Sequence, residues 1–556
     1  MFTPKLFSTL KNYSLSQFRS DCISGVIVGI IALPLAVAFA IASGVSPDRG
    51  LITAVIAGFL ISALGGSRVQ IGGPTGAFVV IVYSIVQRHG MDGLMVATIM
   101  GGIILVAMGC ARFGLAIKYI PHPVIIGFTS GIALIIFSSQ VKDFFGLSID
   151  SLPAEFVAKW VQIIEHFSTI NYYALFIGAG TVFIILFWQK YIKKIPGSFV
   201  ALVLMTVMAR IFHWPVETIG SKFGAMPHSI FTLRLPHVNF EMIGALMPAA
   251  FTIAILAGIE SLLSAAVADG MINGKHRSNM ELVAQGVANI ITPLFGGMPA
   301  TGAIARTAAN VHNGGRTPVS GIVHALTLLL IMVFFGAWAV LVPMPCLAGI
   351  LLIVAYRMSE WHSFCMIFKS PRSDRVVLLV TFLLTVFFDL SLAIQISMVM
   401  AAFLFIHRLS QAVNMNVIMN EFSDEEEKEG ALINKKIIPA GVDIFEIQGP
   451  LFFGMVSTFL EAIKNIEKKP RVRILRMRFV QIVDSTAINA LCNIHRELKK
   501  EGVVLILSGV QPKVFSALRK CGFIDEIGAG NVCKEIDSAL NRAKEFLPVL
   551  KAEKQA

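Results

Sequence analysis

Two short stretches rich in glycine, proline and threonine carry the clearest chemical signal in this sequence. Residues 72–77 read Gly-Gly-Pro-Thr-Gly-Ala, and residues 296–303 read Gly-Gly-Met-Pro-Ala-Thr-Gly-Ala. Each stretch opens an apolar run, 76–87 or 302–311, that is too short to cross a bilayer. Interrupted apolar segments at corresponding positions of two halves are typical of the broken helices of inverted-repeat transporters, in which the substrate binds between them. Tight helix starts used only for close packing are the alternative interpretation.

Two charged residues stand within apolar segments and are candidates for ion chemistry. Glu260 lies inside the apolar span 246–268, and Arg306 follows the second glycine-rich stretch. A charge at the bilayer centre costs about 2.5–3.5 kcal/mol on insertion scales, so such a residue usually faces a cavity or a partner. We therefore expect the two residues to line a substrate path, or to form a structural ion pair with each other. A carboxylate that releases Arg306 to an incoming anion would combine both roles.

The sequence indicates neither an enzyme nor a bound cofactor. It contains no nucleophile–base constellation, no metal-ligand cluster and no phosphate-binding glycine loop. The seven cysteines have no metal-type spacing and are interpreted as reduced thiols. The net charge of +12 fits basic cytoplasmic loops and a basic tail, so nucleic-acid binding is not expected.

The composition predicts an α-helical polytopic membrane protein. Of the 556 residues, 55% are hydrophobic and 14% are charged, and the mean hydropathy is +0.75. Apolar segments of this kind belong in a lipid bilayer. Fourteen are expected, at 22–43, 51–64, 76–87, 91–110, 123–139, 173–188, 199–212, 246–268, 280–295, 302–311, 319–342, 346–355, 376–388 and 391–406.

Lysine and arginine recur in the short loops after the even-numbered segments, and such loops face the cytoplasm. We therefore expect a multi-pass protein of the cell inner membrane, with residues 1–20 and the C-terminus in the cytoplasm. Residues 21–410 would form the membrane domain, with repeats at about 21–213 and 245–410. Seven segments per repeat is an odd number, so the two repeats must have opposite orientations. The predicted architecture is a 7+7 inverted repeat.

After residue 408 the sequence loses its long apolar runs. Residues 411–434 include an acidic run and are expected to form an exposed linker. From 435 to 550, strands are predicted at 442–447, 473–478 and 503–507, and helices at 454–467, 485–500, 511–520 and 533–546. Strands that alternate with helices predict a small cytoplasmic α/β domain.

Several motifs together resemble the sulfate permease (SulP) family of anion transporters. They are Leu33-Pro34, Gly44-Val45-Ser46-Pro47, Gly72-Gly73-Pro74-Thr75, Gly127-Phe128-Thr129-Ser130-Gly131, Glu260-Ser261-Leu262-Leu263, Gln285-Gly286, Asn289 and Arg306-Thr307-Ala308-Ala309-Asn310. The tail resembles the STAS domain that closes such proteins. Residues 31–36 and 142–147 look most like bacterial members described as C4-dicarboxylate transporters. The resemblance implies core and gate domains, a homodimer, and secondary active transport of a small inorganic or carboxylate anion of the C4-dicarboxylate, sulfate or bicarbonate class.

Within this family the substrate lies between two facing half-helices. The N-terminus of a helix offers free N–H groups and about half a positive charge, so two opposed N-termini suit an anion. The expected donors are the amides of Gly76, Ala77, Gly302, Ala303 and Ile304, with the hydroxyls of Thr75 and Thr301 beside them. Arg306 resembles a basic position near the substrate in animal relatives.

The resemblance also implies a coupling site. Glu260 resembles the acidic position at which family members bind a coupling proton or cation, and Ser264 lies one turn later on the same helix face. We therefore expect symport with H⁺ or Na⁺. Leu35 departs from the family, since many members have Gln or Glu directly after the segment-1 proline, so coupling would depend on Glu260. An uncoupled exchanger or channel of the same fold is the alternative, and a membrane-anchored signalling protein is a remote one.

In the tail, Asp484-Ser485-Thr486-Ala487 resembles the signature of bacterial anti-sigma-factor antagonists, with Thr486 at the phosphoacceptor place and Ser485 before it. Ala487 stands where a glycine is expected, which argues against phosphorylation. A serine or threonine at this point can instead be a helix N-cap. The expected role of the domain is regulatory, through contact with a second copy or with a cytoplasmic protein.

Overall fold

The computed structural model describes residues 2–115, 121–149, 152–153, 155–191, 196–224, 232–237, 240–388, 390–411, 414–418, 438–456, 460 and 470–547. The chain divides into two compact units, Met1–Ala401 and Ala402–Ala556. The first is helical, and the second contains a five-stranded sheet with helices on both faces. Each unit is described by itself.

Seven helices of the described chain are long and apolar enough to cross a membrane. They are α2 (Leu15–Ala42), α3 (Pro47–Leu64), α4 (Val79–Cys110) with the 3₁₀ turn η2 (Gly76–Phe78), α5 (His122–Phe145), α10 (Phe240–Ile272), α13 (Pro318–Ala339) and α17 (Leu390–Gln411). Shorter apolar helices occupy the other predicted segments: α7 (Tyr172–Tyr191), α8 (Gly197–Ile211), α11 (Ser278–Leu294), α12 (Ile304–His312), α14 (Met344–Met358) and α16 (Arg372–Phe387).

All fourteen predicted segments are confirmed as helical, because η2 and α4 together account for two of them. Gly90, at φ +63°, breaks this helix between the predicted segments 76–87 and 91–110. Several other helices were not predicted. They are α1 (Lys5–Thr9), α6 (Phe156–Glu165), α9 (Ile219–Phe223), α15 (Trp361–Ile367) and the 3₁₀ turns η1 (Leu10–Asn12), η3 (Phe113–Leu115) and η5 (Phe167–Thr169).

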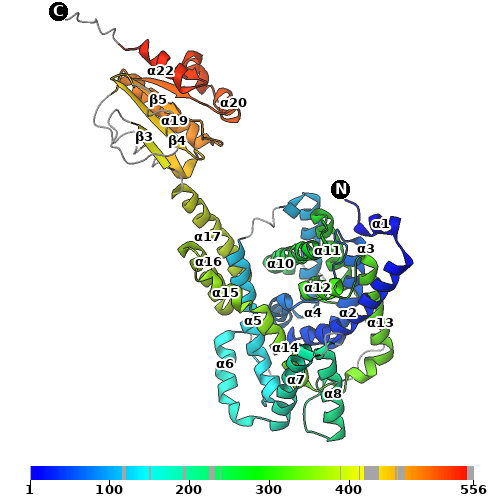
Figure 1. Cartoon of the computed structure of the whole chain (residues 1–556). Helices are drawn as coiled ribbons and strands as arrows, with labels where there is room; N and C mark the ends of the chain where they lie inside the picture. The colour runs from blue at the N-terminus through cyan, green and yellow to red at the C-terminus, as the bar shows by residue number, and fades with distance from the viewer. Residues whose placement is uncertain are drawn as a thin grey trace, which may run out of the picture. The chain divides into compact units, whose positions relative to one another are not determined.

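The helices of the first unit form two bundles in which the repeats interleave. In one, the core bundle, α4 packs on α10 and α11, and α13 packs on α2 and α3. In the other, the gate bundle, α5 packs on α14 and α16, and α14 packs on α7. Figure 1 shows α5, α15 and α16 side by side in the gate bundle. In both bundles each of these packing contacts joins a helix of the first repeat to one of the second.

Glycine permits the closest of these contacts. On α4 and α11, a Cβ added at Gly102 would lie 2.7 Å from the Gly286 carbonyl oxygen, and one at Gly286 would lie 2.6 Å from that of Gly102. In the gate bundle, a Cβ at Gly127 of α5 would lie 2.7 Å from the carbonyl oxygen of Leu378 on α16. Small residues at such crossings let helix backbones approach within a membrane.

The second unit contains a sheet of strand order β3-β4-β5-β6-β7 (Figure 1). The strands are β3 (Asn414–Ile418), β4 (Val442–Gln448), β5 (Val472–Arg476), β6 (Val504–Ser508) and β7 (Val532–Cys533). Strand β3 pairs antiparallel with β4, and the other pairs are parallel. One face packs on α19 (Ser485–Lys500), α20 (Pro512–Lys520) and α21 (Phe523–Ile527), and the other on α22 (Ile536–Lys544). Between α21 and β7 lies the turn η6 (Ala529–Asn531).

The three predicted strands and three of the four predicted helices are present in this unit. The helix predicted at 454–467 lies mostly outside the described residues. Strand β3 is a correction, because Asn414–Ile418 belong to the stretch interpreted as an exposed linker, and they pair with β4. Short polar edge strands such as Asn-Met-Asn-Val-Ile lack the continuous apolar run that identifies a buried parallel strand.

The start of α19 also differs from the expectation. Asp484, rather than Ser485 or Thr486, is the N-cap: its carboxylate accepts hydrogen bonds from the amides of Ala487, at 2.8 Å, and Phe453, at 2.9 Å. A carboxylate near a helix N-terminus also interacts favourably with the helix dipole. Ser485 and Thr486 are exposed in the first turn.

We expect Asp484→Ala to lower the free energy of opening of α19 by about 1–2 kcal/mol, because it leaves two amides without an acceptor. Hydrogen–deuterium exchange of peptides from 485–500 in the full-length protein measures this as exchange that is roughly 5- to 30-fold faster. Ser485→Ala is the matched control and should change exchange little. Equal effects of the two variants would contradict the assignment of the cap.

Candidate functional site

The two glycine-rich stretches meet in the core bundle as a pair of very short antiparallel strands. Strand β1 (Gly72–Gly73) pairs with β2 (Thr301–Gly302), Gly72 opposite Gly302 and Gly73 opposite Thr301. A Cβ at Gly72 would lie 2.3 Å from Cδ1 of Ile61, and one at Gly302 would lie 1.5 Å from Nε2 of Gln70, so neither position has room for a side chain. The pairing brings the starts of η2 and α12 to one place.

The amides at these two helix starts fall into two groups. The amide of Gly302 donates to Oγ of Ser261, at 3.1 Å, and that of Ala303 donates to the carbonyl oxygen of Ile71, at 2.9 Å. The amides of Gly76, Ala77 and Ile304 have no acceptor among the described residues. Of the five predicted donors, three are therefore free to bind a ligand, and two hold the second repeat against its neighbours.

Glu260, on α10, reaches the start of the first half-helix. Its Oε2 accepts a hydrogen bond from Oγ1 of Thr75, at 2.9 Å, and the side chain is half-buried. Thr75 occupies the position before η2, where its side chain caps no backbone amide. The contact joins an ionisable group of the second repeat to the start of the half-helix of the first repeat.

Arg306, on α12, also contacts the residues before the first half-helix. Its Nη2 donates to the carbonyl oxygen of Pro74, at 2.7 Å, and the residue is only 2% exposed. Its Nη1 has no hydrogen-bond partner among the described residues and lies next to Gly73. The structural pair with Glu260 is not among the ion pairs of the described residues. A buried guanidinium without a carboxylate leaves positive charge beside two helix N-termini, which suits a small anion.

Two predicted polar residues are engaged in holding the site together. Thr301 donates from Oγ1 to the carbonyl oxygen of Ala257, at 3.0 Å, and shares a 2.7 Å hydrogen bond with Ser261. Ser264 donates from Oγ to Oγ1 of Thr307, at 3.1 Å, and both residues are buried. These hydroxyls fix α10 against β2 and α12. Among the described residues, no hydrogen bond joins Ser264 to Glu260.

Sequence reasoning did not assign site roles to several buried polar residues. Asn289 of α11 exchanges two hydrogen bonds with Ala300, at 2.8 and 2.9 Å, and so fixes the loop before β2. Oγ1 of Thr307 accepts the amide of Ile71, at 3.1 Å. Both amide atoms of Gln70 are buried against Gly302 without partners among the described residues. The sequence signal available for these residues was a polar side chain inside an apolar segment, as at Asn289 and Thr307.

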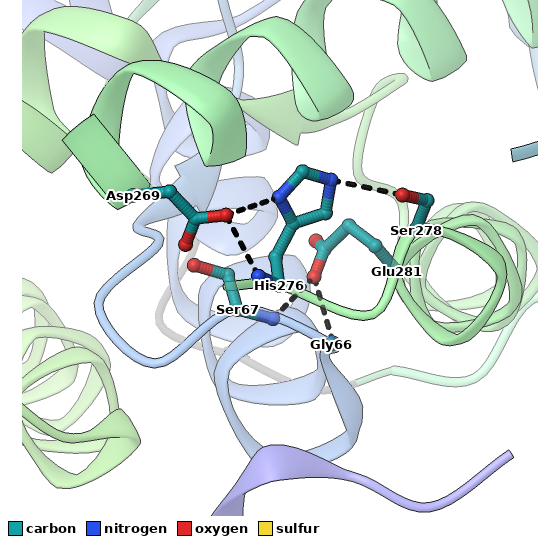
Figure 2. A network of polar contacts seen from close by, with 6 residues as sticks. All are labelled: Gly66, Ser67, Asp269, His276, Ser278 and Glu281. Carbon is teal, nitrogen blue, oxygen red and sulfur yellow. Dashed lines mark hydrogen bonds and ion pairs between the residues drawn. The ribbon is translucent and has the colours of Figure 1, made fainter. Parts of the chain in front are cut away.

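A second network secures the loop between α10 and α11 (Figure 2). Oε2 of Glu281 accepts the amides of Gly66 and Ser67, at 2.8 and 3.0 Å, at the end of α3. Oδ2 of Asp269 contacts both the amide and Nδ1 of His276, each at 2.7 Å, and Nε2 of His276 contacts Oγ of Ser278, at 3.0 Å. The bonds of Glu281 tie the second repeat to the end of α3 in the first, and the contacts of His276 fix the loop between α10 and α11.

A cavity of about 800 Å³ approaches the site from the side of α6. It is lined by residues of α2, α4, α5, α6, α9, α10 and α16, and it extends to Ile136 of α5. A Cβ added at Gly76 would lie 3.4 Å from Cδ1 of Ile136, so the cavity reaches the residue that packs against the first half-helix. Among the described residues, no group of three His, Cys, Asp or Glu could hold a metal ion.

Family profiles match both parts of this chain. The profile of the "Sulfate permease family" matches residues 18–381, and that of the "STAS domain" matches residues 435–539. A Bacillus subtilis (strain 168) protein named "Putative sulfate transporter YvdB" is 40% identical over 521 residues, which cover 93% of this chain and 96% of the relative. The "Bicarbonate transporter BicA" of Picosynechococcus sp. (strain ATCC 27264 / PCC 7002 / PR-6) is 31% identical over 460 residues, 79% of this chain and 80% of the relative.

Solved structures show the same fold. The transmembrane domain of a cyanobacterial BicA superposes with a TM-score of 0.61 and 28% identity, covering 70% of this chain and 98% of that one. The structure of SLC26A9 superposes with a TM-score of 0.87 over 97% of this chain and 92% of that one, and at 18% identity this likeness concerns the fold alone. The relatives are named as transporters and not as enzymes. The chain belongs to the sulfate permease family of membrane transporters and ends in a STAS domain.

Proposed function

We propose that this protein is a secondary active transporter of a small anion, with sulfate and bicarbonate the first substrates to test and a C4-dicarboxylate the third. The observation that carries the proposal is the buried Arg306 guanidinium, which has no carboxylate partner in the described part of the chain and lies beside two helix N-termini. The names of the relatives, which refer to sulfate and bicarbonate, support an oxyanion substrate. The match of residues 31–36 and 142–147 to dicarboxylate transporters is the only support for the third.

In this proposal the anion contacts the amides of Gly76, Ala77 and Ile304 and the guanidinium of Arg306. The hydroxyl of Thr75 can donate to the anion only when it no longer donates to Glu260, because it has a single proton. Gly302, Ala303 and Thr301 hold the start of the second half-helix in place, since their polar groups already bind Ser261, Ile71 and Ala257. Movement of the gate bundle against the core bundle would expose the site to either side in turn.

We further propose that Glu260 couples transport to H⁺ or Na⁺, with Ser264 one turn away. The hydroxyl of Thr75 bonds to Glu260 and precedes the Gly76 and Ala77 amides. A proton or cation on this carboxylate would neutralise a negative charge near the incoming anion, so the two ligands would favour each other's binding.

The Glu260→Gln variant tests the coupling directly. Glutamine keeps an oxygen that can accept from Thr75, but it can neither ionise nor neutralise a cation. We expect proteoliposomes with this variant to exchange anion downhill while accumulation driven by a pH or Na⁺ gradient falls to the level of a collapsed gradient. Glu241→Gln, at the start of the same helix, is the matched control. Undiminished gradient-driven accumulation in Glu260→Gln would remove Glu260 from the mechanism.

The decisive experiment for the function is uptake of labelled sulfate, bicarbonate and succinate by proteoliposomes of the purified protein, with an inward pH or Na⁺ gradient imposed or collapsed. Gradient-dependent accumulation of one anion identifies the substrate and the coupling ion together. Saturable downhill flux that ignores both gradients would indicate an exchanger, and flux without saturation a channel. No flux of any anion would contradict transport and favour a signalling role.

For the surroundings of the protein we propose the cell inner membrane, with both termini in the cytoplasm, and a homodimer. The loops rich in lysine and arginine support this orientation. The exposed Ser485 and Thr486 at the start of α19 would be accessible to a cytoplasmic protein partner of the STAS domain.

A further inference from the structure

The cavity beside α6 contains a lysine in an unusual position. Lys159 lies on α6, a ten-residue helix that is not among the membrane-spanning segments, and the residue is only 4% exposed. Its side chain lines the cavity. Among the described residues its ammonium group has no hydrogen-bond acceptor and forms no ion pair. A buried lysine usually has a partner of opposite charge, and the described residues provide none for Lys159.

The helix that carries Lys159 is held firmly over the cavity. Nε1 of Trp160 donates to Oγ of Ser138 on α5, at 3.1 Å. The hydroxyl of Tyr83 on α4 donates to the carbonyl oxygen of Leu152, at 2.8 Å, just before α6. One contact joins α6 to the gate bundle and the other joins its preceding segment to the core bundle, so Lys159 lies between the two.

The other ionisable groups that line the cavity are mostly basic. They are Tyr83, Arg88 and His89 from α4, Lys142 and Asp143 from α5, Lys222 from α9, and Glu155 directly before α6; the lining residues of α2, α10 and α16 are not ionisable. With Lys159, four lysine or arginine cations face two carboxylates. Lys222 is paired with Asp143, at 3.4 Å. A cavity with an excess of one charge concentrates ligands of the opposite charge.

We infer that this cavity is an anion-capture site, separate from the site at the half-helices, in which Lys159 binds a small oxyanion such as sulfate or bicarbonate before it reaches Gly76. The inference rests on the proposed function for the direction of travel, because the orientation proposed above places α6 outside the cell. The binding itself requires only the cavity and its charges.

The same geometry makes capture sensitive to pH. Burial lowers the pKa of Lys159 from its usual 10.5 to about 8, because the charged form loses hydration. The side chain is therefore a cation below about pH 8 and neutral above it. Between pH 7 and pH 9 the charged fraction falls roughly tenfold, and affinity for the anion should fall with it.

Equilibrium binding of labelled sulfate to the purified full-length protein tests the inference without requiring transport. The Arg306→Met variant removes the charge at the half-helices, so the binding that remains reports the outer site. We expect this variant to bind sulfate at pH 7 and to lose about tenfold in affinity by pH 9. Adding Lys159→Gln should abolish the remaining binding, and adding Lys159→Arg should retain it with no pH dependence, because a guanidinium stays protonated. His89→Gln, which removes the histidine that lines the cavity, is the control and should leave the profile unchanged.

The outcomes separate this inference from the proposed function. Sulfate binding that Lys159→Gln leaves intact, in the wild type and in the Arg306→Met background, would overturn the outer site even if transport is normal. Loss of all sulfate binding in Arg306→Met would also overturn it, because no second site would then remain. In that case Lys159→Arg should show the same pH profile of binding as the wild type. Binding that depends on Lys159, without uptake by the wild type, would support the site and reject the transporter.

Discussion

Replacing Arg306 by methionine is expected to reduce the rate of labelled-anion uptake by roughly 10- to 100-fold. Nη2 of the guanidinium donates to the carbonyl oxygen of Pro74, at 2.7 Å. Nη1 lies beside Gly73 and has no hydrogen-bond partner among the described residues. A hydrogen bond to a charged group contributes about 1.5–3 kcal/mol, and methionine has a similar length but offers no donor and no charge. Uptake by proteoliposomes at several anion concentrations measures the change, which should appear mainly as a higher KM.

Two further variants show what the loss means. Arg306→Lys keeps the charge but cannot serve Pro74 and an anion with the same planar geometry, so its uptake should lie between those of the wild type and Arg306→Met. Arg210→Met removes an exposed arginine from the end of α8 and should leave uptake unchanged. If Arg306→Met transports as well as Arg210→Met, Arg306 does not bind the anion and the proposed site is wrong.

Much of this site could be predicted from the sequence because it depends on local signals. Glycine, proline and threonine before a short apolar run indicate a helix start, and a charge in an apolar segment indicates a partner or cavity. The sequence could not show that the amides of Gly302 and Ala303 are already bonded to Ser261 and Ile71. The bond from Ala303 to Ile71 joins the two repeats, and the bond from Gly302 to Ser261 joins β2 to α10. One chain read alone gives no register for such contacts.

Two other features of the fold were beyond sequence reasoning for different reasons. Helix α6 has only ten residues, and its apolar face is completed by α5, as the Trp160 to Ser138 bond illustrates. Strand β3 is recognisable only from its partner β4, because an edge strand needs one buried face at most. The prediction worked where a segment buries itself by its own pattern and failed where a neighbour completes it.

The largest expected loss of stability comes from Gly50→Ala. Gly50 lies on α3 where it crosses α2, and a Cβ there would come within 1.9 Å of the carbonyl oxygen of Ala36 and 2.9 Å of the Cβ of Ala40. Overpacking in a core typically costs about 1–3 kcal/mol, and here the obstacle is backbone, which cannot move aside by a rotamer change. We expect the purified variant to lose its monodisperse peak in size-exclusion chromatography after heating at a temperature several degrees lower than the wild type.

Gly336→Ala provides the matched comparison. Gly336 also lies within a helix, α13, but a Cβ at this position would meet no atom within 4 Å. Alanine has the higher helix propensity, so this variant should be as stable as the wild type or more stable. Equal losses for the two variants would mean that α2 and α3 are not held at the distance described.

The pairing of β1 with β2 has a consequence for how the protein is made. Gly72 meets Gly302 only after about 230 further residues have left the ribosome, which takes roughly 10 to 50 s at about 5–20 residues per second. During that interval the first half must reside in the membrane with backbone groups of Gly72 and Gly73 that have no β partner. Unpaired backbone groups are costly in lipid, so the nascent chain needs temporary cover from the insertion machinery or from water. The pairing of β1 with β2 can therefore form only after the second half of this transporter has been synthesised and inserted.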